Sequence, residues 1–348
     1  MLETSHTVYF ENANNTSLEA NSIDLVVTSP PYPMIEMWDD IFSETNTTCD
    51  DALEQGEGLK AFEEMHVALD KVWAECDRVL NDEGMLCINI GDATRKLDTS
   101  FQLYPNHSRI STFFREKGYR QLPSILWQKP TNKASKFMGS GMLPPNAYIT
   151  LEHEYVLIFK KDKNRYRRNK EYRYESAYFW EERNKWFSDT WTDILGTRQE
   201  LSDEESRERS ASFPLELPFR LIQMYSVRND VILDPFLGTG TTSVAAAISG
   251  RNSVGIEIDA SFKKAIQSSF DTVEDLSVER AMVRLNQHKA FVEERRDDGK
   301  DFKYSMDEYD MPVTTKQEKE IKFRRSVELT RESQNDELSY RYEHPVIE

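Results

Sequence analysis

Short apolar runs that alternate with helical patterns constrain the fold of this chain most. Such runs, each long enough for one strand buried on both faces, lie at residues 23–27, 85–90, 154–159, 231–234 and 253–258. Residues with helical spacing of apolar side chains separate them, for example at 59–80 and 241–249. Strands alternating with helices predict an α/β fold with a doubly wound, mostly parallel sheet.

The composition excludes several classes of protein. The 348 residues suffice for one large or two ordinary domains, and no apolar run approaches the roughly 18 residues of a membrane helix. The N-terminus lacks the pattern of a secretory signal. The three cysteines, Cys49, Cys76 and Cys87, have no C-x-x-C spacing, which argues against disulfides and a zinc site and is consistent with a reducing compartment. We therefore expect no metal, no membrane association and a cytoplasmic location.

The charge pattern offers one candidate surface for a polyanion. The net charge is −17, and the acidic excess is concentrated in residues 1–92. A basic run with interleaved tyrosines lies at 160–173. Its DNA-binding candidates are Lys160, Lys161, Lys163, Arg165, Arg167 and Arg168. An acidic protein needs such a local basic face to bind nucleic acid, although a solvated strand edge would have the same composition.

A glycine turn joins the strand at 231–234 to the helix that follows it. The turn reads Asp234-Pro235-Phe236-Leu237-Gly238-Thr239-Gly240-Thr241. Gly238 and Gly240 permit positive φ angles and a close approach of a ligand to the backbone. Glu257 ends the next strand, where a carboxylate can bind two ribose hydroxyls. These residues predict an adenosine-type cofactor, whereas the alternative is an ordinary tight turn between a strand and a helix.

A proline motif, Ser29-Pro30-Pro31-Tyr32, ends the first long buried strand. Prolines cannot continue a strand, because each lacks a backbone donor and has a fixed φ. The Ser29 hydroxyl and the Pro30 carbonyl are two acceptors that suit an exocyclic amino group, and Tyr32 offers a face for base stacking. The alternative is a turn that only ends the strand, with Tyr32 in the core.

Together the two motifs resemble the amino-methylating DNA methyltransferases, which modify N4 of cytosine or N6 of adenine. The strand followed by Ser29-Pro30-Pro31-Tyr32 is similar to the catalytic signature of that family, and the segment 234–240 to its S-adenosylmethionine signature. Phe213 and Pro214 before a helix resemble a third cofactor element. Because the catalytic motif precedes the cofactor motif, the chain resembles the circularly permuted beta class.

The resemblance implies methyl transfer from S-adenosylmethionine to a base flipped out of double-stranded DNA. Ser29 and the Pro30 carbonyl would hold the amine, Tyr32 would stack on the base, and Met34 or Trp38 would close the pocket. Serine in the first motif position favours N4 of cytosine. The rivals are N6 of adenine, an enzyme that methylates an RNA or protein amine, and a non-catalytic module that binds DNA and cofactor. The resemblance further implies a companion restriction endonuclease and a monomer or homodimer.

The same resemblance suggests a division of the chain. Residues 1–129 would form the catalytic half, 130–212 a target-recognition region with one sheet strand at 152–161, and 213–270 the cofactor half. Residues 271–348 are predicted to be a charged, helical C-terminal extension, and the polar residues 33–58 a mobile loop.

Overall fold

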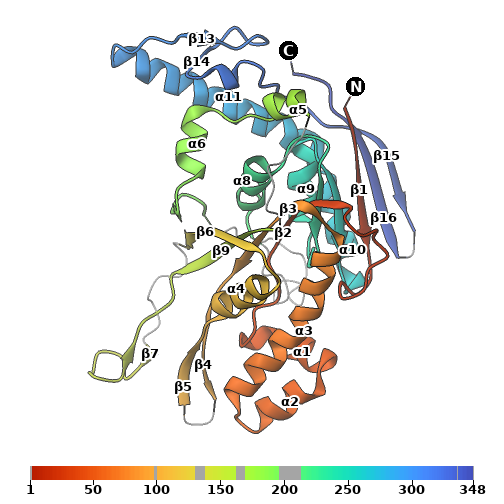
Figure 1. The fold of residues 1–348 in the computed structure, drawn as a ribbon, viewed down its shortest axis with the longest axis vertical. Helices are drawn as coiled ribbons and strands as arrows, with labels where there is room; N and C mark the ends of the chain where they lie inside the picture. The colour runs from red at the N-terminus through yellow and green to blue at the C-terminus, as the bar shows by residue number, and fades with distance from the viewer. Residues whose placement is uncertain are drawn as a thin grey trace.

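A ten-stranded sheet runs through the molecule (Figure 1), in a computed structural model that describes residues 2–97, 100–129, 138–161, 169–195, 213–334 and 336–347. The strands lie in the order β10-β6-β9-β3-β2-β11-β12-β1-β16-β15. Their bounds are β1 Glu3–Tyr9, β2 Ile23–Thr28, β3 Leu80–Ile90, β6 Arg120–Gln128, β9 His153–Lys160, β10 Thr190–Trp191, β11 Val231–Asp234, β12 Asn252–Ile256, β15 Val327–Ser333 and β16 Glu337–Glu343.

The centre of the sheet is parallel, as the sequence predicts. Strands β3, β2, β11, β12 and β1 pair with one another in parallel, whereas β9 runs antiparallel between β3 and β6. Strand β2 lies beside β11 although some two hundred residues separate them in the chain. Strand β1 pairs with β12, so the first strand lies with the glycine-turn strands and not with β2 and β3.

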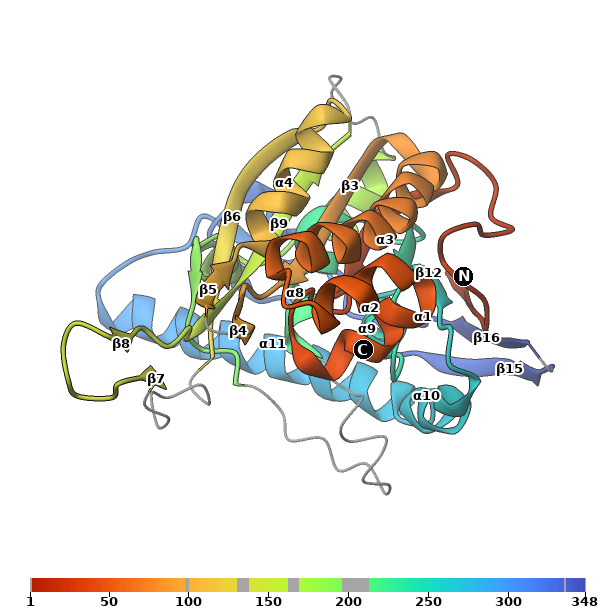
Figure 2. The ribbon, with the colours of Figure 1, turned by 90° about the horizontal axis from the view of Figure 1, so that it is seen from below.

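Helices cover both faces of the sheet (Figures 1 and 2). One layer contains α3 (Gly58–Val79) and α4 (Asn106–Glu116), and the other contains α8 (Glu216–Tyr225), α9 (Thr241–Ile248), α10 (Lys263–Phe270) and α11 (Val273–Asp297). Each layer has its own hydrophobic core. The near-continuous apolar run of β2 contributes side chains to both cores, because Leu25 and Val27 pack toward the second layer and Val26 toward the first.

The segment predicted as a loop at 33–58 is helical, which corrects the sequence-based expectation. It contains a short 3₁₀ turn, η1 (Glu36–Trp38), followed by α1 (Asp39–Thr45) and α2 (Thr47–Glu54), stacked outside α3. Asn46 caps α2 by accepting a hydrogen bond from the Thr48 amide. Only a few apolar side chains, such as Phe42 and Cys49, are buried here, so helical periodicity is weak in the sequence.

The C-terminal extension is not only helical. After α11 come two short strands, β13 (Tyr304–Ser305) and β14 (Pro312–Val313), and then the β15–β16 hairpin, which extends the main sheet through β16 against β1. Leu338, Tyr340 and Tyr342 are buried at alternate positions of β16. That period of two is a strand signal. The polar residues between them, Ser339 and Arg341, and the charged residues at the ends of the strand make the segment resemble a solvated tail in the sequence.

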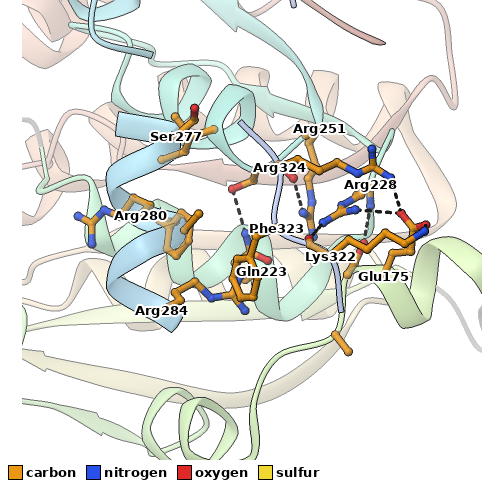
Figure 3. A pocket seen from close by; sticks show the side chains of 17 residues that line it. Glu175, Gln223, Arg228, Arg251, Ser277, Arg280, Arg284, Lys322, Phe323 and Arg324 are labelled. Carbon is orange, nitrogen blue, oxygen red and sulfur yellow. Dashed lines mark hydrogen bonds and ion pairs between the residues drawn. The ribbon is translucent and has the colours of Figure 1, made fainter. Parts of the chain in front are cut away.

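A cluster of charged side chains fastens this extension to the body (Figure 3). The carboxylate of Glu175, at the end of α5 (Lys170–Glu175), lies within 3.0 Å of nitrogen atoms of Arg228, Lys322 and Arg324. Arg228 precedes β11, so the cluster lies at the amino ends of the parallel strands.

Within the described residues, no helix combines the length and the apolar character needed to cross a bilayer.

Candidate active site

The two sequence motifs meet at the carboxyl ends of neighbouring strands. β2 ends at Thr28 and β11 ends at Asp234, and the Thr28 hydroxyl donates to Asp234 Oδ1 over 2.6 Å. Thr242, in α9, donates to the other carboxylate oxygen over 2.7 Å. Asp234 is buried, and burial raises its pKa to about 6 despite these hydrogen bonds. The carboxylate therefore fixes Ser29, next to Thr28, beside the glycine turn.

The glycine turn borders open space at one of its two glycines. Gly238 has a φ of 56°, and no described atom lies within 4 Å of the position that a Cβ would take. Gly240, with a φ of 91°, instead faces Ile266 of α10, 3.6 Å from such a Cβ. Both positions favour glycine for their backbone conformation, but only Gly238 leaves room for a ligand against the backbone.

Glu257 lies directly after β12 and is turned toward the glycine turn. Its Oε2 accepts the Gly238 amide over 2.7 Å and its Oε1 accepts the Asp259 amide over 2.9 Å. Burial raises the pKa of Glu257 to about 7, although both amides favour the charged form. Each oxygen has a lone pair left, so the carboxylate can also accept two hydroxyl groups. These two acceptor oxygens fit the ribose hydroxyls of an adenosine cofactor.

Ser29 belongs to a buried polar network with three other side chains. Its Oγ lies 3.2 Å from the Tyr32 hydroxyl, which donates to Glu154 Oε2 over 2.9 Å. The Asn89 amide donates to the Tyr32 oxygen over 2.8 Å and to Glu154 Oε2 over 2.7 Å. Asn89 lies in β3 and Glu154 in β9, next to β3 in the sheet. The network therefore joins the ends of three strands.

Lys129 completes the network by pairing with the second oxygen of Glu154, and its ammonium lies 4.6 Å from the centre of the Trp127 ring. Glu154 is 7% exposed. Burial, and after it the charge of Glu154, raises the pKa of Tyr32 well above its ordinary value, so Tyr32 remains a protonated donor. The Tyr32 ring packs against Gly91, where a Cβ would come within 2.9 Å of it.

Comparison with known proteins identifies the family. The sequence profile of the N6/N4 methyltransferases, described as DNA methylase, matches residues 23–268. The chain belongs to this DNA methylase family. The predicted S-adenosylmethionine-dependent methyltransferase fold is thereby confirmed, as is S-adenosylmethionine as the cofactor of the family.

Relatives match over most of the methylase chain. The type II methyltransferase M.MthZI of Methanothermobacter thermautotrophicus is 52% identical over 92% of this chain and 90% of its own. M.MjaI of Methanocaldococcus jannaschii, also a type II methyltransferase, is 48% identical over 76% of this chain and 91% of its own. The solved structure of TTHA0409 from Thermus thermophilus, named a putative DNA modification methylase and complexed with S-adenosyl-L-methionine, is 29% identical, with a TM-score of 0.60, over 77% of this chain and 94% of that one.

Of the two residues expected to close the base pocket of the methylase, Met34 lies elsewhere. It is 1% exposed and belongs to the core between α3 and the sheet, with its amide 3.2 Å from Met65 Sδ. Its φ of 68° turns the chain after the proline motif and points to a structural role. Trp38 is partly buried and packs against the same core. The expectation for Met34 is therefore wrong.

The basic run begins at the opposite end of the sheet from Ser29. Strand β9 is antiparallel to β3, so Tyr155 lies opposite Ile90 near the site while Lys160 lies opposite Met85. Lys161 donates to the carbonyl oxygens of Asp77 and Leu80, at 2.5 and 2.8 Å, and thereby caps α3. The structure thus gives Lys161 a structural role. Lys163, Arg165, Arg167 and Arg168 lie outside the described residues.

The remaining predicted cofactor residues are distributed around the glycine turn. Phe213 and Pro214 are buried just before α8, Pro235 is buried in the turn, and Thr241 opens α9. Phe236 packs edge-on against Trp73, with ring centres 5.7 Å apart, so its ring contributes to the core.

The sequence interpretation missed Asn89, Lys129 and Glu154 as members of the site. Asn89 is the only polar residue within the apolar run 85–90, and such a buried amide needs partners. Glu154, the second residue of β9, is a buried charged residue just before the apolar run of that strand, which is a comparable signal.

Proposed function

We propose that this methylase transfers a methyl group from S-adenosylmethionine to the exocyclic N4 of a cytosine flipped out of duplex DNA. The observation that carries the proposal is the 2.6 Å hydrogen bond between Thr28 and Asp234, which brings Ser29 next to the glycine turn. A methyl donor against Gly238 and an amine held at Ser29 would then share one end of the sheet, as direct transfer between them requires.

The cofactor is proposed to lie between Gly238 and Glu257. S-adenosylmethionine supplies, when bound, a methyl group on a positively charged sulfur that leaves as a neutral thioether. Glu257 would accept the two ribose hydroxyls, and the open face of Gly238 would admit the ligand close to the backbone. Asp234, Pro235, Phe236, Gly240 and Thr241 would shape this turn, with Phe213 and Pro214 closing it from the side of α8.

The target amine is proposed to bind at the proline motif. Ser29 Oγ and the Pro30 carbonyl would accept its two hydrogens and turn its lone pair toward the methyl group. Tyr32 would stack on the base, which compensates part of the few kcal/mol that flipping costs. Trp38 remains a candidate for the opposite side of the pocket.

Serine at position 29 supports cytosine over adenine, because Ser-Pro-Pro-Tyr is commoner among the cytosine-N4 members of the family that the sequence resembles. The alternative is an N6-adenine methyltransferase with the same fold. Mass analysis of nucleosides from mixed duplex DNA incubated with the protein and S-adenosylmethionine tests both. We expect N4-methylcytosine; N6-methyladenine as the sole product would overturn the base assignment, and no methylated base would favour a non-catalytic module.

M.MthZI and M.MjaI are named type II methyltransferases, which supports a role of this protein in a restriction-modification system. A companion endonuclease is part of the same proposal. Within the chain, we propose residues 1–129 as the catalytic half, 130–212 as the target-recognition region, 213–270 as the cofactor half and 271–348 as an extension that completes the sheet. The protein would act on double-stranded DNA as a monomer or homodimer. Sequencing that locates methylated bases after treatment of DNA with the protein would give the recognition site.

Two hairpins support the place of the DNA at the end of the sheet that holds Ser29. β4 (Ala93–Leu97) and β5 (Ser100–Tyr104) follow directly on β3, and the turn between β7 (Met138–Gly139) and β8 (Ala147–Tyr148) projects beside them (Figures 1 and 2). Phe101 and Tyr148 stack between the two hairpins at 4.5 Å. Met142 and Ile149 are more than 80% exposed, as expected of side chains that contact a partner.

A further inference from the structure

The polar network around Ser29 contains a continuous hydrogen-bonded path to a buried carboxylate. Ser29 Oγ, the Tyr32 hydroxyl and Glu154 Oε2 follow one another at 3.2 and 2.9 Å. An ionised carboxylate only accepts hydrogen bonds, so Tyr32 donates its proton to Glu154. This fixes the direction of the remaining bonds in the path.

Asn89 determines which group donates in the hydrogen bond between Ser29 and Tyr32. Its amide nitrogen donates to the Tyr32 oxygen, and Tyr32 already donates its single proton to Glu154. The 3.2 Å contact between Ser29 and Tyr32 therefore has Ser29 as the donor. Ser29 Oγ also accepts from the Asn89 amide nitrogen over 3.5 Å, so one of its two lone pairs remains to accept a proton from a group in front of the motif.

The proposed reaction needs such a proton acceptor. When the N–CH₃ bond forms and the S–CH₃ bond breaks, the target nitrogen carries a methyl group, two hydrogens and a positive charge. One proton must leave to give the neutral product. A carboxylate is a much stronger base than a neutral serine hydroxyl, so a carboxylate is the better acceptor for this proton during the reaction.

We propose that Ser29, Tyr32 and Glu154 form a proton-transfer chain that takes the proton released by the methylated amine. The amine proton passes to Ser29 Oγ, the Ser29 proton passes to the Tyr32 oxygen, and the Tyr32 proton passes to Glu154 Oε2. Glu154 ends as a neutral carboxylic acid. Of these three residues only Ser29 touches the amine, so Glu154 is a positioning residue that acts through Tyr32. This inference rests on the proposed function.

Lys129 fixes the orientation of the Glu154 carboxylate, and burial shields that carboxylate from bulk water. The ammonium of Lys129 pairs with Oε1, which leaves Oε2 to Tyr32 and Asn89. Because Glu154 is 7% exposed, its carboxylate is shielded from bulk water and reached from the motif through Tyr32. The proton-transfer chain thus places the Glu154 carboxylate two hydrogen bonds from position 29, where other members of the family carry aspartate.

The single-turnover rate of methyl transfer to DNA, measured at saturating S-adenosylmethionine, tests the proposed proton-transfer chain. The variants are Tyr32→Phe, which removes only the hydroxyl, and Glu154→Gln, whose amide oxygen still accepts from Tyr32 but cannot hold the proton. We expect each to lower the rate about 100-fold or more, within the range typical of general acid–base catalysis. Calorimetry should give an unchanged Kd for S-adenosylmethionine, and Glu154→Asp should recover part of the rate.

The solvent deuterium isotope effect separates proton transfer from simple placement of Tyr32. We expect a normal effect on the wild-type rate that disappears in Glu154→Gln, because the slow step then no longer moves the chain protons. Rates within about threefold of wild type in both variants, or an isotope effect unchanged by Glu154→Gln, would overturn the chain while leaving the proposed function intact. A wild-type protein that methylates no DNA would instead overturn the proposed function.

Discussion

Thr28 and Asp234, 206 residues apart in the chain, are joined by a 2.6 Å hydrogen bond between the Thr28 hydroxyl and the Asp234 carboxylate. Thr28 is the last residue of β2 and precedes the proline motif, while Asp234 is the last residue of β11 and opens the glycine turn. The two strands are parallel neighbours, so their carboxyl ends are adjacent by topology. The hydrogen bond adds a fixed distance to that adjacency.

Thr28→Val tests whether this bond positions the proline motif. Valine has the shape of threonine and leaves the buried carboxylate one donor short, which should lower the free energy of unfolding by about 1–3 kcal/mol. Thr242→Val is the matched control, because it removes a donor from the other oxygen of the same carboxylate. Urea unfolding should show similar losses for both variants. Methyl transfer should fall at least tenfold more in Thr28→Val, and equal rates would contradict a positioning role.

The two glycines of the turn should respond differently to alanine. Both have positive φ, so each substitution costs about 1–2 kcal/mol of backbone strain. Only Gly238→Ala places a methyl group into the open space proposed for the cofactor, whereas Gly240→Ala meets Ile266 at ordinary contact distance. Calorimetry should show at least a tenfold weaker Kd for S-adenosylmethionine in Gly238→Ala. A stronger loss in Gly240→Ala would mean that the cofactor lies on the α10 side.

The sequence was sufficient for the buried strands at the centre of the sheet and for the positions of the two motifs after them, because continuous apolar runs and proline or glycine turns are local signals, but it did not reveal the β15–β16 hairpin. Strand order is not local. Glu154 reaches Tyr32 because β9 inserts antiparallel between β3 and β6, and no spacing in the chain encodes that insertion. The inward direction of Lys161 was equally hidden, since a lysine in a basic run has the same sequence signature whether it binds phosphate or helix carbonyls.

Lys161→Met should therefore affect stability and not DNA binding. The methionine keeps an apolar stem but loses the charged donor to the Asp77 and Leu80 carbonyls, which should cost about 1.5–3 kcal/mol of unfolding free energy. The salt dependence of DNA affinity checks the second half of this expectation. If Lys161 contacted a phosphate, the slope of log affinity against log salt would become shallower by about 0.9.

The pH dependence of cofactor affinity should report on Glu257. Burial raises the pKa of Glu257 to about 7 in the free protein. The ionised carboxylate accepts two hydroxyl groups, whereas the neutral acid carries a proton on one oxygen and accepts less well, so the cofactor binds the deprotonated form. Affinity should therefore rise with pH up to about 7 and be constant above it, with a slope of up to about tenfold per pH unit on the acid side. Calorimetric Kd values between about pH 6 and 8.5 cover the titration of Glu257; Asp234, whose pKa is about 6, still titrates at the acid end of this range, in the wild type and in a Glu257 variant alike. Glu257→Gln should bind more weakly and without this pH dependence, and parallel profiles for wild type and variant would contradict the ribose contact.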